Sequence, residues 1–314
     1  MSPARKGPGQ GRRGRAAAGR KGGKPGKAGP SGGVGGGAAR TGGVRRGQGA
    51  GGGRTGTGRP TGKGLGGEQV EGRQAVRELL LAQRRRVHEI WIASDLQATG
   101  GNDSPVDDIV ALAGANRVPI AWVARKRLES EARSEAPQGV LAKAAELPEA
   151  DFGQLIRLRP GRVPFLVAVD GVTDPGNLGA IARSCDGAGV DGMVVPRHRA
   201  VHVTPTVAKA SAGAVEHMPI ALVPGLPAAL EHMRAAGIWI VGLDDAADRS
   251  LFELGDLGRD AVCLVLGAEG AGLTRLVRER CDMIVSIPMR GSLSSLNVSA
   301  AAALATYEVA RLRT

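Results

Sequence analysis

From Val163 to the C-terminus, short apolar runs alternate with segments whose apolar residues recur at helical spacing. Runs that are apolar at nearly every position are typical of strands buried on both faces, so this alternation predicts an α/β fold with a mostly parallel sheet covered by helices. A ligand site is then expected at the carboxyl ends of the strands, where the loops gather. The strand candidates are Val163–Val169, Gly192–Val195, Met218–Val223, Ile238–Leu243, Ala261–Leu266 and Met283–Ile287.

Residues 68–146 predict a smaller α/β domain that precedes the larger one. A segment of mixed acidic, basic and Pro-Gly composition, residues 147–162, is expected to link it to the larger domain, residues 163–314. Helical spacing, a Ser-Pro helix start and short apolar runs predict the helices and strands of the smaller domain. These are a helix with Val76, Leu79 and Leu80, a helix from Ser104-Pro105 to Ala115, a charged helix from Lys126, and strands at Val87–Ala93, Val118–Ala124 and around Val140.

The first 67 residues have a different composition. They hold 27 of the 50 glycines and 15 Lys or Arg, with no acidic and no aromatic residue. Such a segment cannot bury enough apolar surface to offset its ordering entropy, so a disordered tail is expected. The net charge of the tail is +15 and that of the whole chain is +12, so the remaining residues have a net charge of −3. A flexible polycation binds phosphate backbones without reading sequence. A solubilising extension is the alternative.

The three cysteines, Cys185, Cys263 and Cys281, show no CxxC spacing and fall in or beside apolar runs. Buried free thiols in a reducing compartment are therefore expected, and no metal site. The basic N-terminus lacks the apolar region of a secretion signal, and no segment approaches the length of a membrane span. The sequence thus favours a cytoplasmic protein.

Three polar loops each follow a strand candidate directly. In Asp170-Gly-Val-Thr-Asp-Pro-Gly-Asn-Leu-Gly-Ala-Ile-Ala-Arg-Ser, Asn177 is expected to open a helix that carries Arg183. In Leu264-Val-Leu-Gly-Ala-Glu-Gly-Ala-Gly-Leu, a glycine-rich turn holds Glu269. Its G-x-x-G-x-G order is neither a dinucleotide fingerprint nor a phosphate-binding loop, which disfavours a dehydrogenase. The remaining interpretation is a turn whose backbone approaches a ligand closely.

The third loop is Ile287-Pro-Met-Arg-Gly-Ser-Leu-Ser-Ser-Leu-Asn-Val, after which a helix is expected to begin near Asn297. Its early positions, Ala300 to Ala303, are small enough for another backbone to approach closely. Taken one at a time, each loop has an ordinary structural explanation: a helix cap, a surface cation or a tight turn. Their combination is more informative than any one of them.

In this order and spacing the three loops resemble those of the SpoU (TrmH-like) branch of the SPOUT RNA methyltransferases. The preceding domain, with Glu71-Gly-Arg-Gln-Ala-Val and Pro137-Gln-Gly-Val, resembles the substrate-binding domain of the ribosomal RNA members. The resemblance covers roughly residues 68–314. It implies a homodimer, and a catalytic domain with a C-terminal trefoil knot, although chains as a rule do not thread loops.

The resemblance also implies the chemistry: methyl transfer from S-adenosylmethionine to a ribose 2′-hydroxyl of RNA, without a metal. It places Asn177 and Arg183 at the ribose and phosphate end of the site, where Arg183 matches the family's proposed base. A guanidinium is effectively always protonated, so we expect Arg183 to hold phosphate and ribose instead. Lys209 could meet RNA or be an ordinary solvated lysine. Glu269, Ser295 and Asn297 would complete the polar set, and Gly267, Ile287 and Leu296 would line the donor's pocket.

The additional amino-terminal domain favours large-subunit (23S) ribosomal RNA, at a guanosine, as the substrate. A transfer-RNA 2′-O-methyltransferase is the alternative within the family. The second alternative is a catalytically inactive RNA-binding protein of the same fold. The complete set of polar site residues argues against this alternative.

Overall fold

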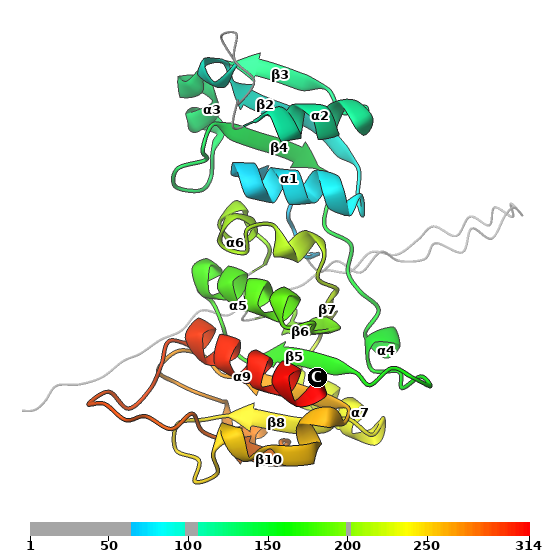
Figure 1. Cartoon of the computed structure of the whole chain (residues 1–314), viewed down its shortest axis with the longest axis vertical. Coiled ribbons are helices and arrows are strands. Elements are labelled where there is room, and N and C mark those ends of the chain that lie inside the picture. Colours follow the sequence, from blue (N-terminus) through cyan, green and yellow to red (C-terminus); the bar gives the residue numbers. More distant parts are fainter. Residues whose placement is uncertain (1–63, 98–105, 199–201) are drawn as a thin grey trace, which may run out of the picture. The chain divides into compact units, whose positions relative to one another are not determined.

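The computed structural model describes residues 64–97, 106–198 and 202–314. This part of the chain contains two sheets, each with its own helices (Figure 1). The segment expected to be a disordered tail lies outside the described residues except for its last four, and Ser104 and Pro105 lie outside them too.

The larger sheet has six strands in the order β10-β8-β9-β5-β6-β7, and every neighbouring pair is parallel. Five of the six strand candidates contain one of these strands, and the sixth, Gly192–Val195, ends one residue before its strand does. The predicted parallel sheet is thereby confirmed. The strands are β5 (Phe165–Val169), β6 (Gly192–Pro196), β7 (Ile220–Val223), β8 (Trp239–Leu243), β9 (Val262–Leu266) and β10 (Met283–Val285).

Apolar cores cover both faces of this sheet. Along β5, Val167 belongs to one cluster, which includes side chains of α5 and α9, while Leu166 belongs to the other, which includes α7. Successive strand residues point to opposite faces, so a strand covered on both sides is apolar at every position. The helices of this part are α4 (Phe152–Leu155), α5 (Pro175–Gly187), α6 (Pro205–Ala210), α7 (Leu226–Ala235), α8 (Arg275–Arg278) and α9 (Val298–Arg313).

The smaller sheet has four strands in the order β1-β4-β2-β3. It is mixed: β2 and β3 are parallel, whereas β4 runs antiparallel to both β1 and β2. The three-residue β1 was not predicted, because it is too short to show an alternating pattern. The elements are β1 (Gln69–Glu71), α1 (Arg73–Ala82), β2 (Val87–Ala93), α2 (Asp107–Ala115), β3 (Ile120–Val123), α3 (Arg125–Glu131) and β4 (Val140–Ala144).

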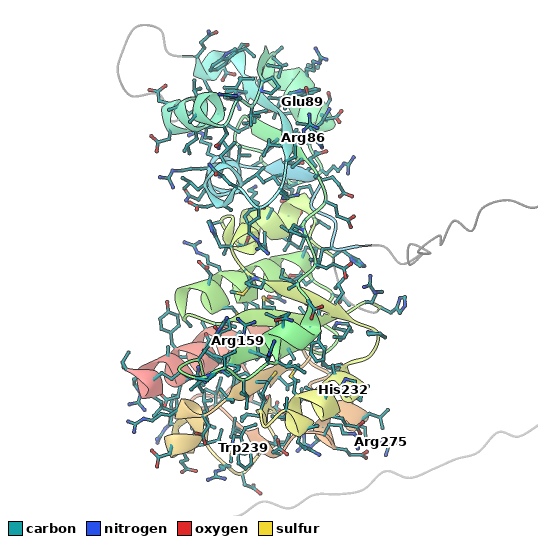
Figure 2. The ribbon with its side chains drawn as sticks, turned by 90° about the vertical axis from the view of Figure 1, so that its right-hand side faces the viewer. Arg86, Glu89, Arg159, His232, Trp239 and Arg275 are labelled. Atoms are coloured by element: carbon teal, nitrogen blue, oxygen red, sulfur yellow. The ribbon has the colours of Figure 1, made fainter. Side chains whose placement is uncertain are left out.

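Figure 2 shows side chains on both sheets, among them Glu89 on β2 and Trp239 at the start of β8. Glu89 forms an ion pair of 3.1 Å with Lys143 on the neighbouring β4. Trp239 is 45% exposed and lies at the amino end of its strand. In the larger sheet the polar loops follow the carboxyl ends of the strands, so the residues at its two ends differ in polarity.

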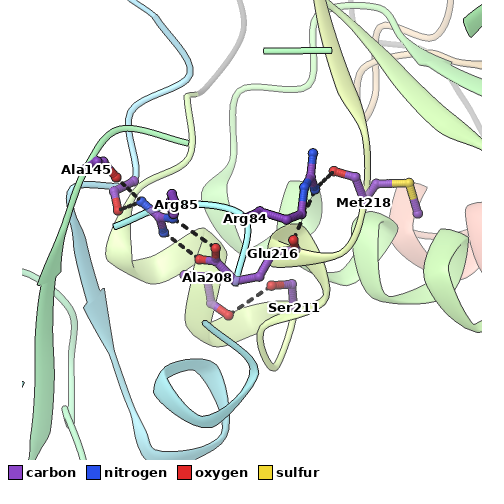
Figure 3. A network of polar contacts seen from close by, with 8 residues as sticks. Arg84, Arg85, Ala145, Ala208, Ser211, Glu216 and Met218 are labelled. Atoms are coloured by element: carbon purple, nitrogen blue, oxygen red, sulfur yellow. Dashed lines mark hydrogen bonds and ion pairs between the residues drawn. The ribbon is translucent and has the colours of Figure 1, made fainter. Parts of the chain in front are cut away.

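A buried ion pair connects the segment after α1, which belongs to the smaller sheet, with Glu216, which lies between α6 and β7 (Figure 3). Nε and Nη2 of Arg85, which follows α1, donate to the two carboxylate oxygens of Glu216 at 3.0 and 2.5 Å. The two side chains are 2% and 0% exposed. Nη1 of Arg85 also donates to the backbone oxygens of Gly67 and Ala145, so both charges have several partners.

The motifs that resemble a substrate-binding domain meet at the same junction. Glu71 is fully buried and accepts from the backbone N–H of Arg133 at 2.7 Å and of Ser134 at 3.0 Å. Gln138 Oε1 accepts from the backbone N–H of Arg73, the first residue of α1, at 3.1 Å. Lys209 of α6 donates to the backbone oxygens of Glu135 and Ala136, in the segment between α3 and β4. Of the two alternatives for Lys209, an RNA contact or an ordinary solvated lysine, the second is therefore not what the structure shows.

Candidate active site

A pocket of about 610 Å³ opens where β8, β9 and β10 end. Its wall is formed by the residues that follow these strands and by the first turn of α9. This volume lies in the range of sites for small organic ligands. The position agrees with the rule that parallel sheets bind ligands at the carboxyl ends of their strands.

The glycine-rich turn after β9 forms one wall of the pocket. Ala268 and Gly272 close it with two backbone hydrogen bonds of 3.0 and 2.9 Å. A Cβ on Gly267 would lie 2.2 Å from the carbonyl carbon of Gly272, so no other residue fits there without moving backbone. Beyond the turn, the backbone N–H of Thr274 donates to Asp170 at 2.7 Å, which ties the turn to the end of β5.

Three residues, one from each polar loop, meet at one carboxylate oxygen. Glu269 Oε2 accepts from Nδ2 of Asn177 at 3.1 Å and from Nδ2 of Asn297 at 3.4 Å. Residues as far apart as 177 and 297 in sequence thus form one polar cluster at the pocket's edge. An ionised carboxylate can accept further hydrogen bonds, and within the described chain no residue donates to Glu269 Oε1.

Asn177 does not open its helix, so that expectation is wrong. Helix α5 begins at Pro175, and Asp174 is its N-cap, whose side chain accepts from the backbone N–H of Asn177 at 2.7 Å. Aspartate at the cap followed by proline is a stronger start signal than asparagine three positions later. The side chain of Asn177 is therefore free of capping and reaches Glu269.

Asn297 caps α9 and contacts Glu269 with different atoms. Its Oδ1 accepts from the backbone N–H of Ser299 at 2.8 Å, as expected for a helix that begins here. Its Nδ2 donates to Glu269. One side chain therefore both caps the helix and donates to Glu269.

The remaining site residues expected from sequence divide into two groups. Gly267, Ile287, Ser295 and Leu296 all line the pocket together with Glu269 and Asn297. Arg183 is exposed on α5 and outside the lining. It forms no hydrogen bond or ion pair with any other residue that the structure describes, so it is not brought to the pocket of its own chain.

Asp244 and Asp245 line the pocket and were missed by the sequence analysis. Both directly follow the predicted strand that became β8, so the rule that located the other loops could have found them. Asp244 Oδ2 is ion-paired with Nη1 of Arg278, and its Oδ1 accepts from the backbone N–H of Ala246 at 3.0 Å. Asp245 is exposed.

All three cysteines are free thiols, and Cys185 and Cys263 are buried as predicted, whereas Cys281 is only partly buried. Burial is the main cause that raises the pKa of Cys185 and Cys263, and it raises that of Cys281 to about 12. No group of three or more His, Cys, Asp or Glu side chains in the described ranges is arranged to hold a metal ion. No helix within those ranges is long and apolar enough to cross a membrane.

Comparison with known proteins gives two family matches. Residues 164–307 match the SpoU rRNA Methylase family, and residues 69–150 match the RNA 2′-O ribose methyltransferase substrate binding domain. The 23S rRNA (guanosine-2′-O-)-methyltransferase RlmB of Pseudomonas aeruginosa is 40% identical over 252 residues, 79% of this chain and 97% of that one. RlmB of Shewanella oneidensis is 41% identical over 247 residues, 78% and 97% of the two chains.

Among solved structures, the SpoU methyltransferase AviRb from Streptomyces viridochromogenes in complex with AdoMet superimposes with a TM-score of 0.64 at 31% identity. The superposition covers 78% of this chain and 89% of that one.

Proposed function

The chain belongs to the SpoU rRNA methylase family, and we propose that the RNA it methylates is large-subunit (23S) ribosomal RNA, at the ribose of a guanosine. It is an RNA ribose 2′-O-methyltransferase, and its methyl donor is S-adenosylmethionine. The observation that carries the site proposal is the meeting of Asn177, Glu269 and Asn297 at one carboxylate oxygen beside the pocket. A ribosomal substrate would place the enzyme in the cytoplasm.

The pocket fits S-adenosylmethionine in size and in backbone. Its volume of about 610 Å³ leaves room for the donor, and the glycine turn at Gly267 keeps side chains off one wall. We propose that the backbone around Gly267, Ile287 and Leu296 holds it. When bound, it supplies a methyl group already activated on a sulfonium, so the protein's task is to position the acceptor and let its proton leave.

Asn177 and Asn297 hold Glu269 in place with their amide groups. We propose that Oε1 of Glu269 accepts from the ribose 2′-hydroxyl and turns the oxygen toward the methyl carbon. Ser295, exposed in the pocket wall, is available as a second polar contact for the ribose. Holding two reactants in line contributes on the order of 7–11 kcal/mol in favourable systems.

Arg183 is proposed to bind the phosphate next to the target ribose. Its side chain is exposed and uncommitted in the described chain, and a guanidinium binds phosphate through two parallel hydrogen bonds. Lysine keeps the charge but loses this geometry. Arg183→Lys should therefore lower turnover at saturating S-adenosylmethionine, and near-normal turnover would count against a role that depends on the guanidinium's shape.

The site assignment is tested with single-turnover methyl transfer on ribosomal RNA. Asn177→Ala, Glu269→Gln and Asn297→Ala should each lower the rate more than they weaken RNA binding. Unchanged rates in all three would overturn the assignment. The substrate is tested by mapping 2′-O-methyl positions in ribosomal and transfer RNA after deletion of the gene.

Loss of a guanosine methyl from 23S ribosomal RNA supports the proposal. Loss from a transfer RNA favours the alternative within the family. Loss of no methyl group, with RNA binding retained, favours an inactive RNA-binding protein of the same fold.

We further propose residues 68–146 as the RNA substrate-binding domain, 147–162 as the linker and 163–314 as the methyltransferase domain. We propose a trefoil knot in the last of these because the chain belongs to the SpoU family; the packing of α9 against α5 is compatible with it. A homodimer is supported by Leu304 and Tyr307, which are 42% and 54% exposed on α9.

The tail is proposed to add electrostatic affinity for RNA. Leu65 is buried, and its backbone oxygen accepts from Val203, so the cleanest truncation removes residues 1–63 only. This truncation should weaken RNA binding and flatten its salt dependence while methyl transfer on bound RNA continues. If binding at low salt does not change, the tail is a solubilising extension.

A further inference from the structure

The charged residues that line the pocket all carry the same sign. They are Asp244, Asp245 and Glu269, and no Lys, Arg or His of the described chain lines it. Asp244 is ion-paired with Arg278, and Glu269 accepts two neutral amides. Asp245 is exposed and is bonded to no other described residue, so its full charge faces the pocket and solvent.

This inference rests on the proposed placement of S-adenosylmethionine in this pocket, which the donor and its product would occupy in turn. The two ligands differ by one positive charge. S-adenosylmethionine carries a sulfonium, an ammonium and a carboxylate, a net charge of +1. In the transfer the sulfur–methyl bond breaks, a bond from the methyl carbon to the ribose oxygen forms, and the hydroxyl proton is lost to water. The sulfur keeps the electron pair of the broken bond, so the product, S-adenosylhomocysteine, is a thioether with no net charge.

We propose that Asp245 makes the pocket select the charged donor over the neutral product. Its carboxylate attracts the donor by a Coulomb interaction that disappears when the methyl group leaves, which favours product release and lowers product inhibition. The attraction between an exposed carboxylate and a cation near a protein surface changes affinity by roughly three- to tenfold. Exposure of Asp245 also makes the effect sensitive to salt.

Asp245 is the residue to change because its neighbours have other tasks. Asp244 holds Arg278 and the turn at Ala246, so its loss would disturb the pocket wall itself. Glu269 belongs to the proposed catalytic cluster. Asp248 provides a matched control, because it is also an exposed carboxylate of the same loop but is outside the lining.

The test is calorimetric titration of the full chain with S-adenosylmethionine and, separately, with S-adenosylhomocysteine. Asp245→Asn should raise the Kd of the donor about three- to tenfold and change that of the product less than twofold. Asp245→Glu, which keeps the charge, should retain most of the preference, and Asp248→Asn should change neither Kd. Raising the salt to 0.5 M should narrow the gap between wild type and Asp245→Asn, with screening over a Debye length of about 4 Å.

Two results would overturn the proposal. If Asp245→Asn raises the Kd of both ligands equally, the residue shapes the pocket and does not discriminate between ligands by their charge. No change for either ligand means that its carboxylate does not act on the sulfur centre. Failure of the wild-type chain to bind either ligand would instead contradict the placement of the donor in this pocket.

Discussion

Replacing Arg85 by methionine should destabilise the protein strongly, because it leaves the Glu216 carboxylate buried without its counterion. The two side chains are 2% and 0% exposed, and Glu216 accepts from two nitrogens of Arg85 at 3.0 and 2.5 Å. Breaking a buried pair by removing one partner costs about 3–5 kcal/mol. With a urea slope of about 2.5 kcal/mol per molar for a chain of this size, the unfolding midpoint should fall by about 1–2 M.

The double variant Arg85→Met, Glu216→Leu separates the cost of the stranded charge from the loss of packing. Apolar replacement of a whole buried pair is often close to neutral, so most of the lost stability should return. A deficit of about 1–2 kcal/mol should remain, because the backbone oxygens of Gly67 and Ala145 lose their donor. The exposed pair of Arg275 with Glu279 is the control, and Arg275→Met should cost less than about 0.5 kcal/mol (Figure 2).

Urea unfolding followed by tryptophan fluorescence suits the measurement. Trp91 and Trp122 report on the smaller sheet and Trp239 on the larger one. A loss below 1 kcal/mol for Arg85→Met would refute the reasoning, since the carboxylate would then have reached solvent or another donor. A double variant as unstable as the single one would show that the arginine's other contacts, and not its charge, hold this junction together.

Other contacts lead to further predictions. Gly267→Ala should abolish binding of S-adenosylmethionine in calorimetric titration, because the new Cβ meets the backbone of Gly272 at 2.2 Å, whereas Gly291→Ala, with open space around it, should bind normally. The pKa of Cys281 near 12 leaves roughly one thiolate in ten thousand at pH 8, so mass spectrometry should find it unmodified by iodoacetamide until urea unfolds the chain. Asn297→Asp should keep stability, since aspartate caps a helix equally well, but lower turnover, because a carboxylate cannot donate to Glu269.

The strands of the larger sheet could be predicted to within two residues at either end because burial on both faces makes their sequences continuously apolar. The same logic failed for β1, which contributes three residues to the smaller sheet. The ion pair of Arg85 with Glu216 could not be predicted either. Its partners lie 131 residues apart, and each alone resembles an ordinary surface charge.

The site shows why residue identity was easier to predict than geometry. For Asn177 the local explanation, a helix cap, was wrong because Asp174 occupies that position, and this leaves the amide to Glu269. For Asn297 the helix-cap explanation was right, but it does not exclude a contact in the site. Its Oδ1 caps α9 while its Nδ2 donates to the carboxylate of Glu269. A side chain with a donor at one atom and an acceptor at another can serve the helix and the site together. A structural role for a polar residue at the carboxyl end of a parallel sheet is therefore no argument against a chemical one.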